Sequence, residues 1–159
     1  MAKYDLEKLL NDIETILKAN LNTKLAAIDT EKADSITLAT VDSTAYVRQS
    51  LNGETVNSDP FIFYGVDEIE TVEGLGFGTN AKYSITVMLI LADMNADLDI
   101  ANRMFRYLRA IQEVFQENWN ETDNGVKLFI SSLAPIAVTD MDTNATYRAI
   151  GVKLEATLA

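Results

Sequence analysis

The stretch from Ala81 to Ala92 constrains the fold most, because it is long, apolar and alternating. Such a pattern is typical of a β-strand, whose side chains point to opposite faces in turn. One face carries large apolar side chains, namely Tyr83, Ile85, Val87, Leu89 and Leu91. The other face begins with Ser84 and Thr86 and continues with Met88 and Ile90. Because its second half is apolar on both faces, we expect a central strand that is covered on both sides.

Two amphipathic helices are predicted, one before this strand and one after it. From about Asp5 to Leu25, apolar residues recur every three or four positions: Leu6, Leu9, Leu10, Ile13, Ile16 and Leu17. From about Asp97 to Trp119, we expect the buried side to hold Ala101, Met104, Phe105, Leu108, Ile111 and Phe115. The opposite side of that helix then carries Arg103, Arg106, Arg109, Glu113 and Glu117. Both helices are expected to pack on a sheet.

The remaining strands follow from alternation and from turn residues. Asn52-Gly53 is a hairpin signal, with expected strands at Ala45–Leu51 and Glu54–Asn57. Further strands are expected at Phe61–Thr71, Val126–Leu133 and Thr146–Leu158, with a polar turn from Asp140 to Asn144. The predicted fold is α+β, with an antiparallel or mixed sheet packed against two main helices. We expect one domain over residues 1–159, with a polar arm at about 29–60 that contacts a neighbouring subunit or forms a surface flap.

Composition removes several classes of function. The 159 residues include no histidine and no cysteine, and their formal net charge is −11. The usual carriers of catalysis and metal binding near neutral pH are therefore missing, and we expect no enzyme, cofactor or metal. Broad binding to nucleic acid or to an anionic membrane needs clustered Lys and Arg, which this balance opposes. The longest apolar run, Val87 to Ala92, is far shorter than the roughly 20 residues that span a bilayer.

Two motifs suggest ligand sites and fail on spacing. Asp93-Met-Asn-Ala-Asp-Leu-Asp99 matches the start of a calcium loop, but such a loop needs glycine at its sixth position and glutamate at its twelfth. Those positions hold Leu98 and Met104, so helix capping explains the carboxylates better. Gly74-Leu-Gly-Phe-Gly78 precedes a strand and not a helix, which favours a hairpin turn over a phosphate loop.

Three places are candidates for contacts in an assembly. The arm contributes Tyr46, Arg48, Asn52 and Gly53, and the glycine-rich turn contributes Leu75 and Phe77. On the second helix, Arg103, Arg106 and Arg109 could meet an acidic partner or DNA. The four-residue spacing of Arg109 and Glu113 favours a solvated, salt-bridged face instead.

The order of elements resembles the tail terminator (tail-completion) proteins of tailed bacteriophages, of the phage lambda type. The likeness rests on the first helix, on Phe61–Tyr64 with Tyr83–Ala92, on Met104–Ala110 in the second helix, and on the closing strand Tyr147–Glu155. It covers nearly the whole chain and is architectural, without an invariant motif. The polar excursion is longer than in the simplest members, so another neck or tail-associated ring protein remains open.

The resemblance implies a small, acidic, non-enzymatic virion protein, located in the tail or neck and assembled in the host cytoplasm. It implies a homohexameric ring that caps the tail tube and joins it to the head. The implied partners are other copies, the tail tube protein and the head–tail connector or neck proteins, while DNA passes through the lumen without specific binding. Two other classes remain open, a tail tube subunit and a carboxylate-based enzyme acting on a small molecule or carbohydrate.

Overall fold

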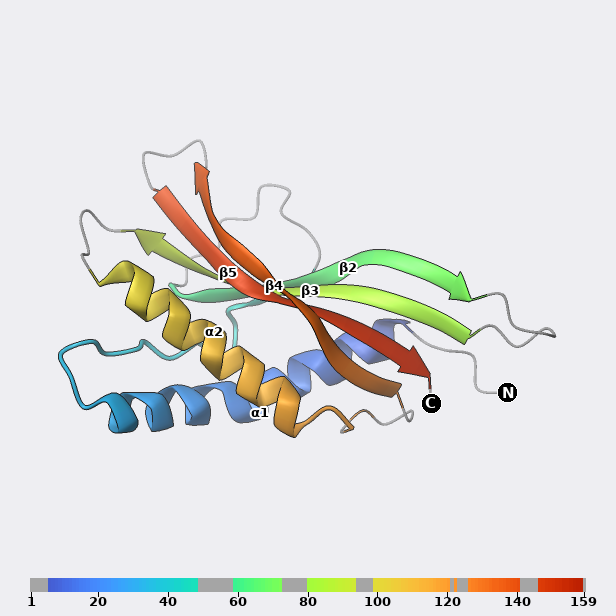
Figure 1. Cartoon of the computed structure of the whole chain (residues 1–159), viewed down its shortest axis with the longest axis horizontal. Coiled ribbons are helices and arrows are strands. Elements are labelled where there is room, and N and C mark those ends of the chain that lie inside the picture. Colours follow the sequence, from blue (N-terminus) through green and yellow to red (C-terminus); the bar gives the residue numbers. More distant parts are fainter. Residues whose placement is uncertain are drawn as a thin grey trace.

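The computed structural model describes residues 6–48, 59–72, 80–93, 99–120, 122, 126–140 and 146–158. The elements, in chain order, are α1 (Leu6–Lys32), β1 (Tyr46–Arg48), β2 (Phe61–Val72), β3 (Asn80–Asp93), α2 (Ile100–Glu117), β4 (Val126–Asp140) and β5 (Thr146–Leu158). The strands form one sheet in the order β1-β2-β3-β5-β4 (Figure 1). β1 runs parallel to β2, and the other pairs are antiparallel. The predicted α+β fold is confirmed, and of the two expected sheet types, antiparallel or mixed, the sheet is mixed.

β3 is the central strand, as its pattern predicts. It pairs with β2 on one side and with β5 on the other. Ile85, Val87 and Leu89 are fully buried on the face toward the helices. On the opposite face Ile90 is also buried and Met88 is half-buried.

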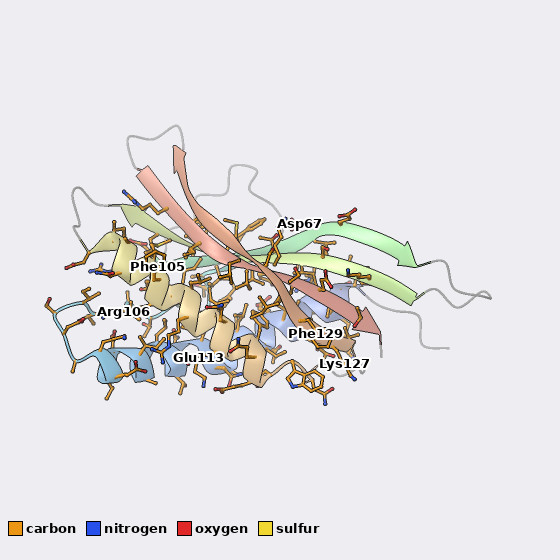
Figure 2. All side chains as sticks on the ribbon, in the orientation of Figure 1. Asp67, Phe105, Arg106, Glu113, Lys127 and Phe129 are labelled. Carbon is orange, nitrogen blue, oxygen red and sulfur yellow. The ribbon has the colours of Figure 1, made fainter. Side chains whose placement is uncertain are left out.

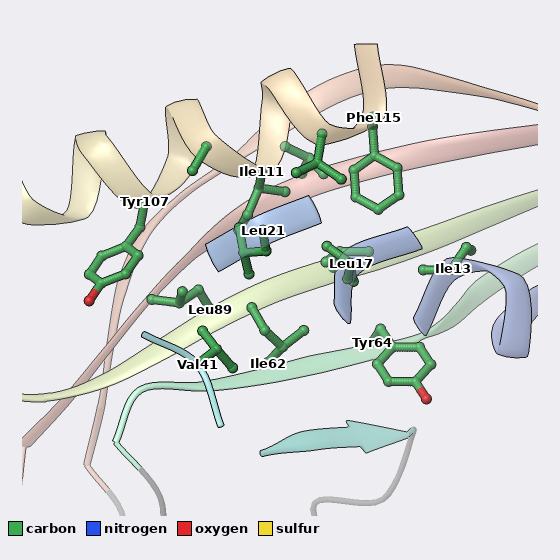
Figure 3. Packing of buried hydrophobic residues seen from close by; sticks show 14 of the residues in the cluster. Ile13, Leu17, Leu21, Val41, Ile62, Tyr64, Leu89, Tyr107, Ile111 and Phe115 are labelled. Atoms are coloured by element: carbon green, nitrogen blue, oxygen red, sulfur yellow. The ribbon is translucent and has the colours of Figure 1, made fainter. Parts of the chain in front are cut away.

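Both helices cover the same face of the sheet (Figure 1). Leu17 and Leu21 of α1 lie over Ile62, Tyr64 and Leu89, as the close view of the core shows (Figure 3). α2 lies along β5 and β4 and also packs on α1. The two helices and the inner sheet face enclose one apolar core, which is the dominant stabilising feature of such a fold.

α1 is longer than the sequence pattern predicts. The expected end at Leu25 is wrong, because the helix continues to Lys32 and buries Ile28. It ends where Ala33 adopts a positive φ of 46°, the left-handed conformation that commonly closes a helix. The additional turns are polar in composition, so periodicity alone does not reveal them.

α2 is rotated relative to the predicted wheel. Ala101 and Phe105 are exposed, which corrects their assignment to the core. The helix buries a wide sector, consisting of Ile100, Met104, Tyr107, Ala110, Ile111, Val114 and Phe115. The reason is that α2 contacts α1 and the sheet together, and the Tyr107 hydroxyl reaches the carbonyl oxygen of Ala39 at 2.9 Å.

β4 also exceeds its predicted length. The expected end at Leu133 is wrong, because the strand continues through Pro135 to Asp140, into the region expected to be a turn. β4 lies at an edge of the sheet, where a missing N–H is tolerated. Its pairing with β5 shifts register twice, between Ile130 and Ser132 and between Ala134 and Ala137.

Residues 33–45, the first half of the expected polar arm, pack on the helices. The Leu38 N–H donates to the Asp29 carboxylate at 3.0 Å. The Asn22 side chain exchanges two hydrogen bonds with the backbone of Val41, at 2.9 and 3.0 Å. β1 then pairs with β2, and the expected hairpin around Asn52-Gly53 lies outside the described residues.

Candidate functional site

Two of the three predicted contact arginines on α2 bind carboxylates of their own chain. Arg106 binds Asp34 with two nitrogens, one at 2.9 Å, and also donates to the carbonyl oxygen of Ile36 at 3.2 Å. Arg109 donates to both Glu31 oxygens, at 2.8 and 2.6 Å, and to Glu113 at 2.7 Å. The expected Arg109–Glu113 pair is thus confirmed. These ion pairs tie α2 to the end of α1 and to the segment that follows it.

The same contacts hold two carboxyl groups in their ionised form. Hydrogen bonds from Arg109 lower the pKa of Glu31 from 4.5 to about 2. Hydrogen bonds from Arg106 and from the Ile36 N–H lower the pKa of Asp34 from 3.8 to about 2. A carboxyl group with so low a pKa is a poor general base near neutral pH. We therefore interpret this cluster as structural.

Tyr46 and Arg48, the described candidates on β1, belong to a polar cluster with α1. Arg48 binds Asn11 and lies 3.6 Å from Glu14, and its Nε donates to the Tyr64 hydroxyl at 3.3 Å. The Tyr64 hydroxyl in turn donates to Glu14. The Nζ of Lys18 lies 5.3 Å from the centre of the Tyr46 ring, within the range of a cation–π contact.

Titration of this cluster lies outside the neutral range. Burial and the hydrogen bond to Glu14 raise the pKa of Tyr64 to about 12. Burial opposes ionisation of Glu14, but hydrogen bonds from Lys18 and Tyr64 outweigh it and lower its pKa. The cluster fastens β1 to α1 and offers no acid or base matched to pH 7.

The other predicted contacts are not brought into one site by the structure. Asn52, Gly53, Leu75 and Phe77 lie outside the described residues, as do the glycines of the 73–79 turn. Of the calcium-like stretch, residues 94–98 also lie outside them. Asp99 is the N-cap residue of α2, the position expected for a capping carboxylate, but its side chain makes no capping hydrogen bond. Arg103 is half-buried on α2.

The structure reveals a groove that the sequence did not predict, between the end of α2 and the start of β4. Phe115, Gln116, Trp119, Leu128, Phe129 and Ile130 line this α2–β4 groove, whose volume is about 380 Å³. The Leu128 N–H donates to the carbonyl oxygen of Trp119 at 2.9 Å, which fixes the chain after α2 against β4. The rings of Trp119 and Phe129 then lie 5.9 Å apart, with the Nζ of Lys127 5.5 Å from the centre of the indole ring. Figure 2 labels Phe129 and Lys127 at the start of β4.

Exposed apolar side chains lie in this groove and further along β4. Trp119 is 39% exposed, Phe129 46% and Leu133 49%. β4 is the last strand of the sheet, so one side of its backbone has no partner strand in the described part of the chain. Between Val126 and Thr139, Lys127 is the only charged residue. An edge strand that is long, apolar and poor in charge is a ready surface for another protein.

Sequence signals for this surface exist, but they are weak. The pair Trp119 and Phe129 flanks a polar connection, and the run after Lys127 lacks charge. Both features are equally typical of a buried strand. Only the position of β4 at the sheet edge distinguishes an exposed surface from a buried strand.

Within the described residues, no group of three or more His, Cys, Asp or Glu side chains could hold a metal ion. Neither of the two described helices combines the length and the apolar character that crossing a membrane requires.

No family model and no curated protein sequence matches the chain. One solved chain from "Virion of native gene transfer agent (GTA) particle" is similar at 13% sequence identity and a TM-score of 0.41, over 90% of this chain and 95% of that chain. A second solved protein is similar at 11% identity and a TM-score of 0.39, over 91% of this chain and 94% of the other.

Proposed function

We propose that this chain is a structural virion protein of a tailed bacteriophage that assembles into a ring, ends the tail tube and joins it to the head or neck. The elements on which the resemblance rests are all present: α1, the β2–β3 pair, α2 and the closing strand β5. The proposal assigns the chain no catalytic activity. The ring is a hexamer in the family that the chain resembles.

The observation that carries the self-association is the exposed edge of β4. Its apolar residues Phe129 and Leu133 are exposed, one on each face of β4, and Lys127 is the only charged residue between Val126 and Thr139. A chain with a net charge of −11 repels its own copies at long range, so a contact must form where acidic side chains are scarce. The β4 edge meets that requirement.

The other partners follow from the proposed place in the virion. One side of the ring meets the tail tube protein and the other meets the connector or neck proteins. DNA passes through the lumen without specific binding, which acidic side chains in excess over basic ones would favour. The arm residues Asn52 and Gly53 and the turn residues Leu75 and Phe77 stay candidates for these contacts.

The mass of the purified full chain tests the proposal. Sedimentation and light scattering over about a hundredfold range of concentration should detect one closed oligomer of the 17.6-kDa chain. Negative-stain images should show rings of a single size. A monomer at every concentration contradicts the proposal, and filaments that grow without limit indicate a tube subunit instead.

A charge on the β4 edge provides a matched test of the surface. Leu133→Lys places a cation on the exposed apolar edge and should shift the oligomer toward the monomer. Ala27→Lys makes the same change in charge on the exposed side of α1 and should leave the oligomer unchanged. Equal masses for both variants would exclude the β4 edge as the contact.

A further inference from the structure

We infer that β4 of one copy adds to a free edge of β2 in the next copy, so that the two sheets join into one. The inference rests on the proposed self-association and names the surface that β4 meets. In the described part of the chain, β1 pairs only with residues 62–64 of β2, and no strand lies beside the later part of that edge. Residues 67–72 of β2 are here named the β2 edge.

The β2 edge and the start of β4 lie at the same end of the sheet (Figure 1). One line of backbone partners crosses the sheet there, through Glu68, Ser84, Glu155 and Phe129. Within the described residues, this end is four strands wide and has an open backbone edge on each side, to which a further strand can add. A contact between two different edges is heterologous, so its repetition produces a ring or a filament.

The directions of the strands suit this contact. Each neighbouring pair among β2, β3, β5 and β4 is antiparallel, so β4 runs opposite to β2 within one chain. A ring axis that lies along the strands preserves this relation between copies. β4 then meets β2 of the next copy in the antiparallel sense, which is the more stable way for two strands to pair.

Charge selects β4 and not a second β2 edge as the occupant. The β2 edge includes Asp67, Glu68 and Glu70 and no basic residue, so two such edges would place like charges opposite one another. Asp67 and Glu68 are exposed. The start of β4, residues 126–132, carries a single charge, the cation Lys127, and therefore complements the acidic edge.

Cross-linking through introduced cysteines tests the inference, because the chain has none of its own. Glu68 and Phe129 are exposed and lie level with each other on one face of the sheet. A short bis-maleimide reaches direct and diagonal neighbours on adjacent strands, which lie up to about 8 Å apart. In the variant Glu68→Cys/Phe129→Cys, it should join successive copies into a covalent ladder that extends beyond the dimer on a denaturing gel.

Controls separate this contact from other ways of associating. Each single-cysteine variant should stay at the mass of the monomer. Ala27→Cys/Phe129→Cys moves one cysteine to the exposed side of α1 and should give no ladder. Dimers from Phe129→Cys alone would mean that β4 pairs with β4 of a second copy, which overturns the inference. An assembled Glu68→Cys/Phe129→Cys variant that forms no ladder overturns it as well.

Reversing one charge provides a second, independent test. Lys127→Glu adds a carboxylate beside the acidic β2 edge and should weaken self-association about threefold to tenfold at low salt, and less at high salt. Lys32→Glu makes the same change in charge at the exposed end of α1 and should leave self-association unchanged. Sedimentation measures the association, and circular dichroism should show native folding of every variant.

Equal association of the Lys127→Glu and Lys32→Glu variants contradicts the inference. A ring of the original chain that fails these tests leaves the proposed function standing, whereas an original chain that stays monomeric overturns both.

Discussion

At the residue scale, Gly151 is a position where the sheet tolerates little change. It lies on β5 opposite Met88 of β3. A Cβ at this position would lie 2.0 Å from the carbonyl oxygen of Val87 and 2.7 Å from the Cα of Met88. Both atoms belong to the backbone of the central strand, which cannot yield as a side chain could. Glycine is therefore required by the close approach of β3 and β5.

We predict that Gly151→Ala lowers the free energy of unfolding by at least about 2 kcal/mol, since overpacking inside a rigid structure costs this much or more. Urea denaturation measures the change. Thr157→Ala, a half-buried residue later in the same strand, should change stability far less. Equal stabilities of the two variants would contradict the prediction, because β3 and β5 could then move apart enough to accept the added Cβ.

At the element scale, ion pairs decide how α2 sits against α1 and residues 33–45. The side chain of Arg106 is only 11% exposed and holds Asp34 and the carbonyl oxygen of Ile36 together. Arg109 connects Glu31 with Glu113 across the two helices. The arginine-rich side of α2 is thereby a connection within the chain.

The Arg106–Asp34 pair should make stability depend on acid pH. Folding lowers the pKa of Asp34 from 3.8 to about 2, so the pair stabilises the fold above about pH 4, and this stabilisation is lost as pH falls toward 2. Arg106→Gln should thus be less stable than the original chain at pH 7 and approach it near pH 2.

Urea denaturation between pH 2 and 7 measures this difference, and Asp34→Asn completes a double-mutant cycle. The coupling between the two residues should be present at pH 7 and largely lost at pH 2. A coupling that does not vary with pH would mean that the carboxylate charge plays no part.

At the scale of the whole molecule, charge opposes binding to DNA. The formal charge is −11, and carboxylates of the same chain contact Arg106 and Arg109, two of the three arginines considered for DNA. Neutralising DNA phosphates requires Lys or Arg side chains that are available for the contact. Such binding depends on salt, because these side chains release counterions from the DNA. The charge balance thus opposes binding to DNA over a broad face.

We predict that the chain does not retain double-stranded DNA in a mobility-shift assay at about 0.15 M salt, up to protein concentrations of about 100 µM, near the weak limit of non-specific binding. Arg106→Gln should give the same result. Retention that weakens steeply with salt would contradict the prediction and restore the arginines as a DNA contact.

Sequence alone determined the central strand, both helices and the α+β class, because burial imposes a period of two on strands and of 3.6 on helices. Tertiary structure decided the rest. The sequence pattern predicts Phe105 in the core. Because α2 contacts both α1 and the sheet, the Phe105 side chain instead lies at the surface. Phe129 and Leu133 lie in a predicted strand, and the position of β4 at the sheet edge exposes them. Periodicity reports which residues are apolar, whereas only packing determines which of them find a partner within the chain.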